Sequence, residues 1–271
     1  MVIAQISDMH VLRAGSRLFG ALDTFGLLAR CVEHLNRLPT PPDAVLVTGD
    51  MTNDGEPADY EALAGLLDRL AMPYYPIPGN HDDREHTRRA FRHLGVLPAT
   101  GPLHYAVEHL LVRLIALDTV VPGETHGHLG AEQLAWLEAT LRAAPDRPTI
   151  VFLHHPPFPT GIEHMDAIRL ADADALRAVI ARHAQVERVA CGHLHRAIQV
   201  RWAGTVAVTA PGTAHQVALT LGPGDPARWI AEPPGALLHL WQEGVGVVTH
   251  VTYVGDHGGL QRFDQPHAIA S

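Results

Sequence analysis

From the first residue to about residue 200, short apolar runs rich in β-branched residues alternate with segments of helical periodicity. The apolar runs predict buried strands at 2–6, 44–47, 74–77, 149–153 and 186–190. Apolar residues at helical spacing predict helices around 25–35, 57–70, 134–141 and 175–180. An alternation of strands and helices is typical of a layered α/β fold, so we expect that class.

After residue 196 the helical patterns stop, and strand-like runs follow one another at 198–202, 205–209, 215–221, 236–241 and 246–254. We therefore divide the chain into a core, residues 1–200, and a strand-rich tail, residues 201–271, that completes a second sheet. Helices that could cover both faces of these strands are lacking, so the tail is also expected to contribute an interface between copies of the chain, in a homodimer or a higher homo-oligomer. The alternative is that these strands only complete the sheet.

Composition excludes several kinds of protein. The chain has 271 residues, of which 46% are hydrophobic, and this is enough to bury the core of one large domain. Its 29 acidic residues outnumber its 20 basic residues, which gives a formal charge of −9 and disfavours binding to long nucleic acids. All basic residues are Arg, so a P-loop and a Schiff-base lysine are excluded. The 20 His residues are where the chemistry is expected.

The cysteines and the apolar segments bear on the cellular compartment. Cys31 and Cys191 both lie in apolar surroundings, where they are expected to be buried free thiols rather than a disulfide framework. The N-terminal residues lack the basic and apolar regions of a signal peptide. No stretch approaches the roughly 18 apolar residues of a membrane helix. We therefore expect a cytoplasmic protein without membrane contacts.

The residues that follow five of the predicted strands are rich in oxygen and nitrogen donors. The loops at the carboxyl edge of an open α/β sheet gather around the ligand, so these donors are expected to meet there. Seven donors are too many for one ion and suit two ions that share a carboxylate. The absence of Cys from the set disfavours a structural zinc site and fits a hydrolytic site of Fe, Mn, Co or Zn. The donors are Asp8, His10, Asp50, Asn80, His154, His193 and His195.

Each of these motifs is weak when it is taken alone. An Asp after a strand, such as Asp8 or Asp50, is usually a turn residue, and Asn80 could cap a helix. The pair His193 and His195 is stronger, because two imidazoles two residues apart after a strand rarely serve packing. The occurrence of all the motifs in order, each at a strand end, is what predicts a metal site.

The complete set resembles the calcineurin-like metallophosphoesterases: Asp8-x-His10, Gly49-Asp50, Gly79-Asn80-His81-Asp82, His154 and Gly192-His193-x-His195. Within that superfamily the chain is similar to the bacterial class III cyclic-nucleotide and glycerophosphodiester phosphodiesterases. The resemblance extends from Val2 to about Val217. It implies a four-layer α/β/β/α sandwich, and binuclear-metal-dependent hydrolysis of small phosphodiesters by a metal-activated hydroxide.

The resemblance also implies how the donors divide between two divalent or mixed-valence ions. The first ion would be held by Asp8, His10, Asp50 and His195, and the second by Asp50, Asn80, His154 and His193. Asp50 would bridge the two ions. The choice of His154 over His155 follows the family pattern, in which the ligand lies two residues before the proline.

Four further residues are expected near the substrate. His81 is not needed as a ligand, so we expect it to protonate the leaving oxygen or to stabilise the developing charge. Its alternative role is support of Asp50. Asn53 either faces the substrate or forms a turn. His155 and His215 are expected to face the substrate or to support the ligands.

Two other functions compete with this one. A metal-free interaction scaffold on the same fold could lose ligands, yet all seven donors are present. A nuclease of the same superfamily would need a basic surface, which the −9 charge and the lack of a basic run disfavour. Cyclic nucleotides, glycerophosphodiesters and simple alkyl diesters share one phosphoryl centre. Choice among them depends on the loops at 11–24 and 119–130 and on the tail.

Overall fold

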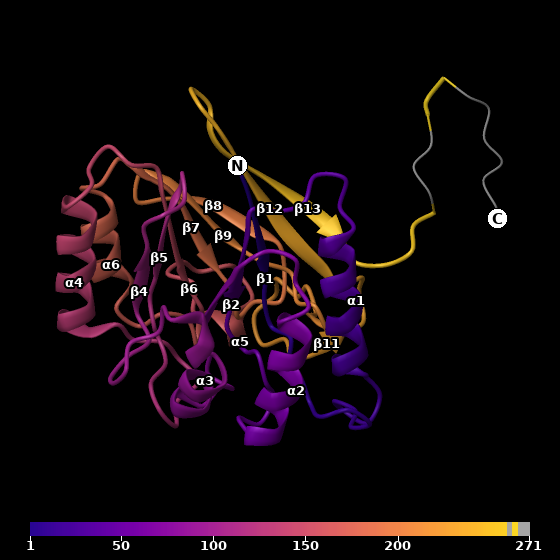
Figure 1. The fold of residues 1–271 in the computed structure, drawn as a ribbon. Helices are drawn as coiled ribbons and strands as arrows, with labels where there is room; N and C mark the ends of the chain where they lie inside the picture. The colour runs from indigo at the N-terminus through magenta and orange to yellow at the C-terminus, as the bar shows by residue number, and fades with distance from the viewer. Residues whose placement is uncertain (259–261, 265–271) are drawn as a thin grey trace.

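Two β-sheets pack face to face, and each carries helices on its outer surface, as the ribbon in Figure 1 shows. The structure is a computed structural model that describes residues 1–258 and 262–264. Its layers are helices, sheet, sheet and helices, which confirms the predicted four-layer α/β/β/α architecture.

The first sheet has five strands in the order β13-β12-β1-β2-β3. Strands β1, β2 and β3 run parallel, and β12 lies antiparallel to β1 and to β13. The bounds are β1 Val2–Ile6, β2 Ala44–Thr48, β3 Tyr74–Ile77, β12 Gly235–Gln242 and β13 Gly246–Tyr253.

The second sheet has six strands in the order β4-β5-β6-β7-β9-β8. Strands β5, β6, β7 and β9 run parallel, and the outer strands β4 and β8 are antiparallel to their neighbours. The bounds are β4 Tyr105–Val107, β5 Arg113–Ala116, β6 Thr149–Leu153, β7 Val186–Cys191, β8 Ile198–Trp202 and β9 Thr205–Thr209.

The helices cover the outer faces of the two sheets. Helix α1 (Thr24–Asn36) begins after Asp23, whose carboxylate accepts a hydrogen bond from the Gly26 N–H at 3.0 Å, and helix α2 (Pro57–Leu67) begins at its proline. Both pack on the first sheet. Helices α4 (Gly130–Arg142) and α6 (Ala173–Ile180) pack on the second. The shorter helices are α3 (Arg84–Ala90), α5 (Glu163–Asp166) and the 3₁₀ turn η1 (Arg92–Leu94).

The alternation of side chains along each central strand divides the apolar residues among three cores. On β1, Ala4 and Ile6 point toward the helices and Ile3 points toward the other sheet. On β6, Val151 and Leu153 likewise face the helices. Because both faces of these parallel strands are covered, their residues are mostly apolar, as the sequence indicated.

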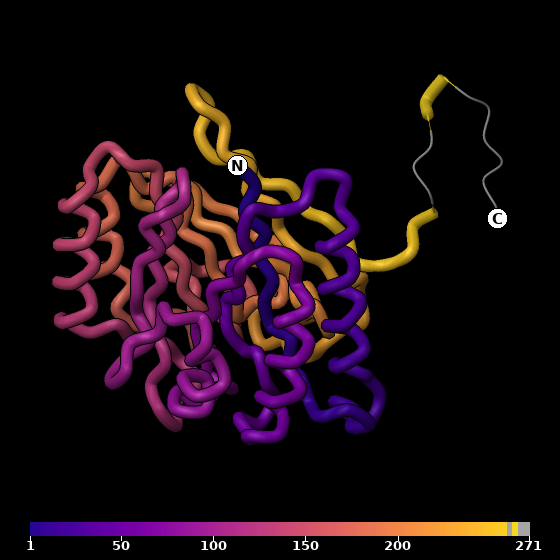
Figure 2. The backbone as a smooth tube through the Cα atoms, in the orientation of Figure 1, coloured from indigo at the N-terminus to yellow at the C-terminus, as the bar shows by residue number. Residues whose placement is uncertain are grey.

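The tail differs from its prediction, because its strands divide between the two sheets. Strand β9 joins the six-stranded sheet, whereas β12 and β13 extend the five-stranded sheet beside β1. The backbone in Figure 2 shows the yellow strands of the tail beside the indigo first strand. The physical reason is that β1 has β2 on one side only, and β12 pairs with the backbone groups of its other edge.

The predicted strand at 215–221 is reduced to β10 (Gln216–Val217), which pairs with β11 (Trp229–Ile230) in a short ribbon. Residues 259–261 and 265–271 of the predicted tail lie outside the described residues. No helix in the described part of the chain has the length and hydropathy that crossing a membrane requires.

Candidate metal centre

The carboxyl ends of five parallel strands meet at one edge of the sandwich and bring the seven predicted donors together. Strands β1, β2 and β3 are followed by Asp8, Asp50 and Asn80, and β6 and β7 by His154 and His193. Asn80 is half-buried, and the other six donors are buried. A buried cluster of imidazoles and carboxylates is costly unless its members are paired or bind a cation.

The backbone of the donor loops is held in an unusual conformation. Seven non-glycine residues in the described chain have a positive φ, and five of them belong to the donor set. The φ angles are 53° at Asp8, 43° at His10, 46° at Asp50, 69° at His193 and 49° at His195. Side chains rarely adopt this region, and such strain concentrates at functional sites.

Glycines in the same motifs keep space for the donors. Gly49 has a φ of +89°, and a Cβ at this position would collide with the His154 ring. A Cβ at Gly79 would collide with the Asp50 carboxylate. A Cβ at Gly192 would meet Ser7 Oγ and the Thr48 carbonyl. Gly is therefore required at these positions for close packing around the donors.

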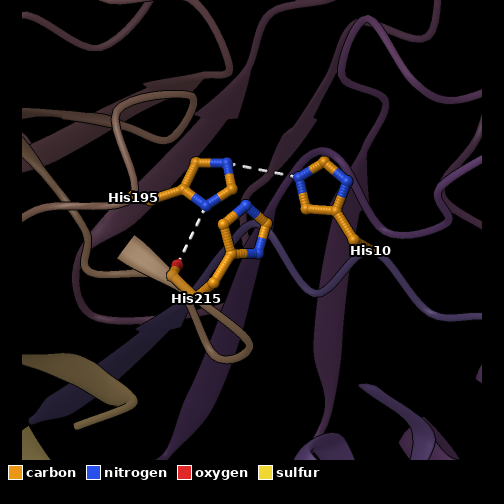
Figure 3. Close-up of side chains that lie close together, drawn as sticks. All are labelled: His10, His195 and His215. Carbon is orange, nitrogen blue, oxygen red and sulfur yellow. Dashed lines mark hydrogen bonds between the residues drawn. The ribbon is translucent and has the colours of Figure 1, made fainter. Parts of the chain in front are cut away.

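One group of donors comprises Asp8, His10, Asp50 and His195, whose possible ligand atoms all lie within 4.8 Å of one another. His10 Nε2 and His195 Nε2 are 3.2 Å apart and face each other in Figure 3. Asp50 Oδ2 lies 3.6 Å from His10 Nε2, and Asp8 Oδ1 lies 3.5 Å from His195 Nε2. These atoms converge on one point.

A second group surrounds His154. Its Nε2 atom lies 3.2 Å from Asn80 Oδ1, 3.2 Å from His193 Nδ1 and 3.4 Å from Asp50 Oδ1. The two oxygens of Asp50 therefore face different groups, Oδ2 toward His10 and Oδ1 toward His154. This is the position expected of a carboxylate shared by two cations.

Hydrogen bonds to the far side of the rings fix their orientation. His154 Nδ1 donates to the Thr48 carbonyl at 2.8 Å, and His195 Nδ1 donates to the His215 carbonyl at 3.0 Å. His195, which burial keeps neutral, then presents the lone pair of Nε2 to the centre, and His154 does the same once its Nε2 is deprotonated. A backbone carbonyl in this position is a common partner of metal-binding His.

The electrostatics of the cluster favour a cation. Burial raises the pKa of Asp8 to about 7, and the neighbouring Asp50 carboxylate adds to this. Burial lowers the pKa of His195 to about 4 and holds the pKa of His10 and of His193 well below its usual range. Burial also disfavours a charged His154, but the adjacent Asp50 carboxylate raises its pKa to about 9.

The residues present fit a metal centre. Asp8 Oδ2 is buried and has no hydrogen-bond partner among the described residues. His10 Nε2 and His195 Nε2 face each other although both rings are held neutral by burial. Unpaired buried acceptors of this kind are costly, and a bound cation removes the cost. Carboxylate, amide and imidazole donors without thiolate suit Mn, Fe, Co or Zn.

His81 and Asn53 lie together beside the first group. The His81 backbone N–H donates to Asp50 Oδ1 at 3.0 Å, and His81 Nδ1 donates to the Asn53 carbonyl at 2.8 Å. The His81 side chain is exposed, and its Nε2 is left available to a ligand. The Asn53 amide oxygen lies 3.3 Å from His10 Nδ1, so this residue contacts a donor as well as His81.

His155 and His215 are both buried at the centre. Both nitrogens of His155 have protein partners, since Nδ1 lies 2.8 Å from Thr119 Oγ1 and Nε2 lies 3.2 Å from the Thr125 carbonyl. His215 packs its ring on His195 with centroids 4.4 Å apart, and its Nδ1 has no partner in the described structure (Figure 3). Burial lowers the pKa of His215 to about 3 and keeps it neutral.

Asp82 is a supporting residue to which the sequence motif assigned no role. Its buried carboxylate accepts hydrogen bonds from the N–H groups of Met51 and Thr52 at 3.0 Å and of Gly79 at 2.9 Å. Tyr60 donates to the same carboxylate at 3.0 Å. Asp82 thereby ties the loop that carries Asp50 to the loop that carries Asn80.

Replacing Asp82 with Ala is expected to lower the free energy of unfolding by about 3 kcal/mol, because it leaves three buried N–H groups without an acceptor. Urea unfolding measures the change. Asp82→Asn keeps one acceptor oxygen and should lose less. A stability of Asp82→Ala equal to that of the wild type would show that these hydrogen bonds do not support the loops.

The layered fold, with a donor cluster at the shared edge of two sheets, defines a protein of metallophosphoesterase architecture. Residues 1–197 match the model of the calcineurin-like phosphoesterase family, and the chain belongs to that family. The resemblance found in the sequence motifs is thereby confirmed.

Two curated relatives are similar over most of the chain. A probable glycerophosphodiester phosphodiesterase of Arcobacter nitrofigilis is 36% identical over 97% of this chain and 97% of its own. A cAMP/cGMP dual specificity phosphodiesterase of Mycobacterium tuberculosis is 36% identical over 82% of this chain and 70% of its own. Among solved structures, a dimetal phosphatase from Danio rerio shares the fold with a TM-score of 0.65 at 13% identity, over 94% of this chain and 99% of that one.

Proposed function

We propose that this protein hydrolyses small phosphodiesters, which include cyclic nucleotides, glycerophosphodiesters and related alkyl diesters, at a centre of two metal ions. The observation that carries the proposal is the place of Asp50, with one oxygen toward each donor group. The protein is a metal-dependent phosphodiesterase, since it belongs to the calcineurin-like family and its relatives along most of the chain are phosphodiesterases.

The proposed ligand sets follow the two groups of side chains. Asp8, His10, Asp50 and His195 would hold one ion, and Asn80, His154 and His193 with Asp50 would hold the other. The ions are divalent or mixed-valence Fe, Mn, Zn or Co. His154 is the preferred ligand over His155, because both nitrogens of His155 are engaged by Thr119 and Thr125.

When bound, the ions neutralise charge on the phosphoryl oxygens and make a water molecule acidic enough to attack near neutral pH. His81 supplies the proton for the leaving alcohol from Nε2, because its Nδ1 is committed to the Asn53 carbonyl. Asn53 orients both His10 and His81. The neutral His215 lies beside the His10 and His195 rings and faces the same centre.

The two competing functions are not favoured. A scaffold has no need of buried, strained donor loops, and all seven donors are retained here. A nuclease for long substrates requires a basic surface, whereas this chain carries a formal charge of −9.

The test is hydrolysis of a panel of diesters, with a phosphate monoester as the control. We expect the metal-loaded protein to hydrolyse at least one cyclic nucleotide or glycerophosphodiester faster than the monoester. Chelation should remove the activity, and added Mn²⁺ or Zn²⁺ should restore it. Hydrolysis that persists undiminished in a metal-free preparation, or no hydrolysis of any diester by the loaded protein, would contradict the proposal.

A homo-oligomer with an interface in the tail is part of the proposal. Around the β10–β11 ribbon, Leu219, Leu221 and Ile230 are exposed by 59%, 66% and 43%. An apolar patch of this kind is commonly covered by a partner, and two-fold pairing is the commonest arrangement. Sedimentation of the dilute, metal-loaded protein should give at least twice the chain mass of 29.3 kDa. A single species at the monomer mass would overturn it.

The cytoplasm is the proposed location. Cys31 and Cys191 are both buried free thiols, and unpaired cysteines are usual in a reducing compartment. Fractionation of the source cells with an antibody to the protein tests this assignment.

A further inference from the structure

We propose that the stacked rings of Phe19 and Trp229 form a platform that selects phosphodiesters carrying a nucleobase over diesters of small aliphatic alcohols. The inference rests on the proposed function, because it names the substrate class for the same site. Its basis is a continuous series of ring contacts from the metal centre to the protein surface.

The series begins at His195 and His10, two of the proposed ligands. The His215 ring lies 4.4 Å from the His195 ring and 5.3 Å from the His10 ring, between centroids (Figure 3). The Phe19 ring meets the His215 ring at 5.3 Å in an edge-on contact, and the Trp229 ring lies 6.0 Å from it. One buried residue thus separates the ligands from the platform.

In the single chain, the outer end of this series is open to solvent. Phe19 is exposed by 56% and Trp229 by 40%, whereas His215 is exposed by 7%. The two outer rings stack with centroids 5.1 Å apart and an interplanar angle of 20°. They already contact each other, so a ligand cannot enter between them. A flat ligand can only extend the stack from its exposed side.

The turn that carries Phe19 is held in a strained conformation. Phe19 has a φ of 52°, which is unfavourable for a large side chain. The flanking Leu18 is buried, and its N–H donates to the Leu22 carbonyl at 2.9 Å, which closes the turn. This strain lowers the stability of the fold while it holds an aromatic ring in solvent. Backbone strain of this kind is concentrated at ligand sites.

Trp229 is anchored separately, from the other end of the chain. It pairs with Val217 in the β10–β11 ribbon, and Arg196 Nη1 donates to the Val217 carbonyl and to Glu232 at 2.7 Å. Arg196 directly follows His195, so the ribbon is tied to the loop that carries a proposed ligand. The platform is thus fixed relative to the metal centre.

The chemistry of the platform distinguishes the candidate substrates. A nucleobase presents a flat π-face that stacks on indole or phenyl rings, and this contact tolerates different bases. In a nucleoside phosphodiester, one ribose separates the phosphoryl group from the base. In the protein, the His215 ring likewise lies between the proposed metal ligands and the Phe19 and Trp229 rings. Glycerol and small alkyl alcohols have no π-face and gain nothing from the platform.

The first test compares kcat/KM for 3′,5′-cyclic AMP and for glycerophosphoethanolamine in the metal-loaded protein. Phe19→Leu and Trp229→Leu keep apolar bulk but remove the flat face. Each should lower kcat/KM for the cyclic nucleotide about tenfold, through KM, and change it less than about twofold for the aliphatic diester. Trp229→Phe should recover most of the loss. Tyr253→Leu, an equally exposed aromatic on β13, is the matched control and should change neither value.

A second readout separates this inference from the proposed function. Adenosine monophosphate should quench the fluorescence of the wild-type protein, and Trp229→Phe should lose most of the quench although Trp136, Trp202 and Trp241 remain. Quenching without hydrolysis would contradict the proposed function but support the platform. Absence of quenching, equal losses for both diesters, or a change of oligomeric state with unchanged selectivity would overturn the platform.

Discussion

Asp50→Asn is expected to lower diester hydrolysis by at least ~10³-fold and to reduce the content of both metal ions. Asp50 is the one donor that faces both groups, with Oδ2 toward His10 and Oδ1 toward His154. Asparagine keeps the shape of the side chain but supplies no negative charge and only one acceptor oxygen. Turnover and the metal content per chain, measured on the same preparation, check this result.

The matched control makes the same chemical change away from the site. Asp174 is exposed near the start of helix α6, and Asp174→Asn should leave turnover and metal content unchanged. If Asp50→Asn keeps two tightly bound ions and near-normal turnover, Asp50 does not bridge them.

His81→Ala should slow turnover by about 10²–10⁴-fold and leave the metal content intact. The reason is that the bond from His81 to Asp50 Oδ1 comes from the backbone N–H, which alanine retains. What alanine removes is the imidazole, with its Nε2 available to the leaving oxygen. Steady-state kinetics together with metal analysis measure both parts of the prediction.

His93→Ala is a suitable control, because His93 is an exposed residue of the η1 turn that contacts Asp68 and Tyr74 rather than the donor set. If His81→Ala instead loses metal and excess Mn²⁺ restores its activity, the imidazole supports Asp50 and does not protonate the leaving oxygen. The two outcomes differ in metal content and cannot be confused.

Much of the fold could be predicted because its signals are local. The parallel strands are mostly apolar and alternate with segments of helical periodicity. Strands β1, β2, β3, β6 and β7 were therefore recognisable from their own residues. The donors directly follow these strands, and parallel strands bring their carboxyl ends to one edge. The positions of Asp8, Asp50 and His193 therefore followed from the chain order alone.

The rest depended on contacts between distant segments. The pairing of β12 with β1 joins residues more than two hundred positions apart, and strand patterns do not reveal which edge a strand will join. The Asp82 carboxylate accepts hydrogen bonds from backbone N–H groups, which nearly all residue types have. No pattern of side chains in the sequence could therefore predict these contacts. The stack of Phe19 on Trp229 also joins opposite ends of the sequence.

The antiparallel pairing of β12 with β1 has a consequence for the order in which this protein is made. On the ribosome, the strand that leads to Asp8 and His10 emerges well before β12, so one of its edges stays open until residues 235–242 have been synthesised. An open edge can pair with other chains, and long-range pairing of this kind is slow. The donors span residues 8–195, yet a nascent chain that ends at residue 200 leaves β1 unpaired on that side. Translation of the tail, rather than of the last donor, therefore completes the pairing of the strand that leads to Asp8 and His10.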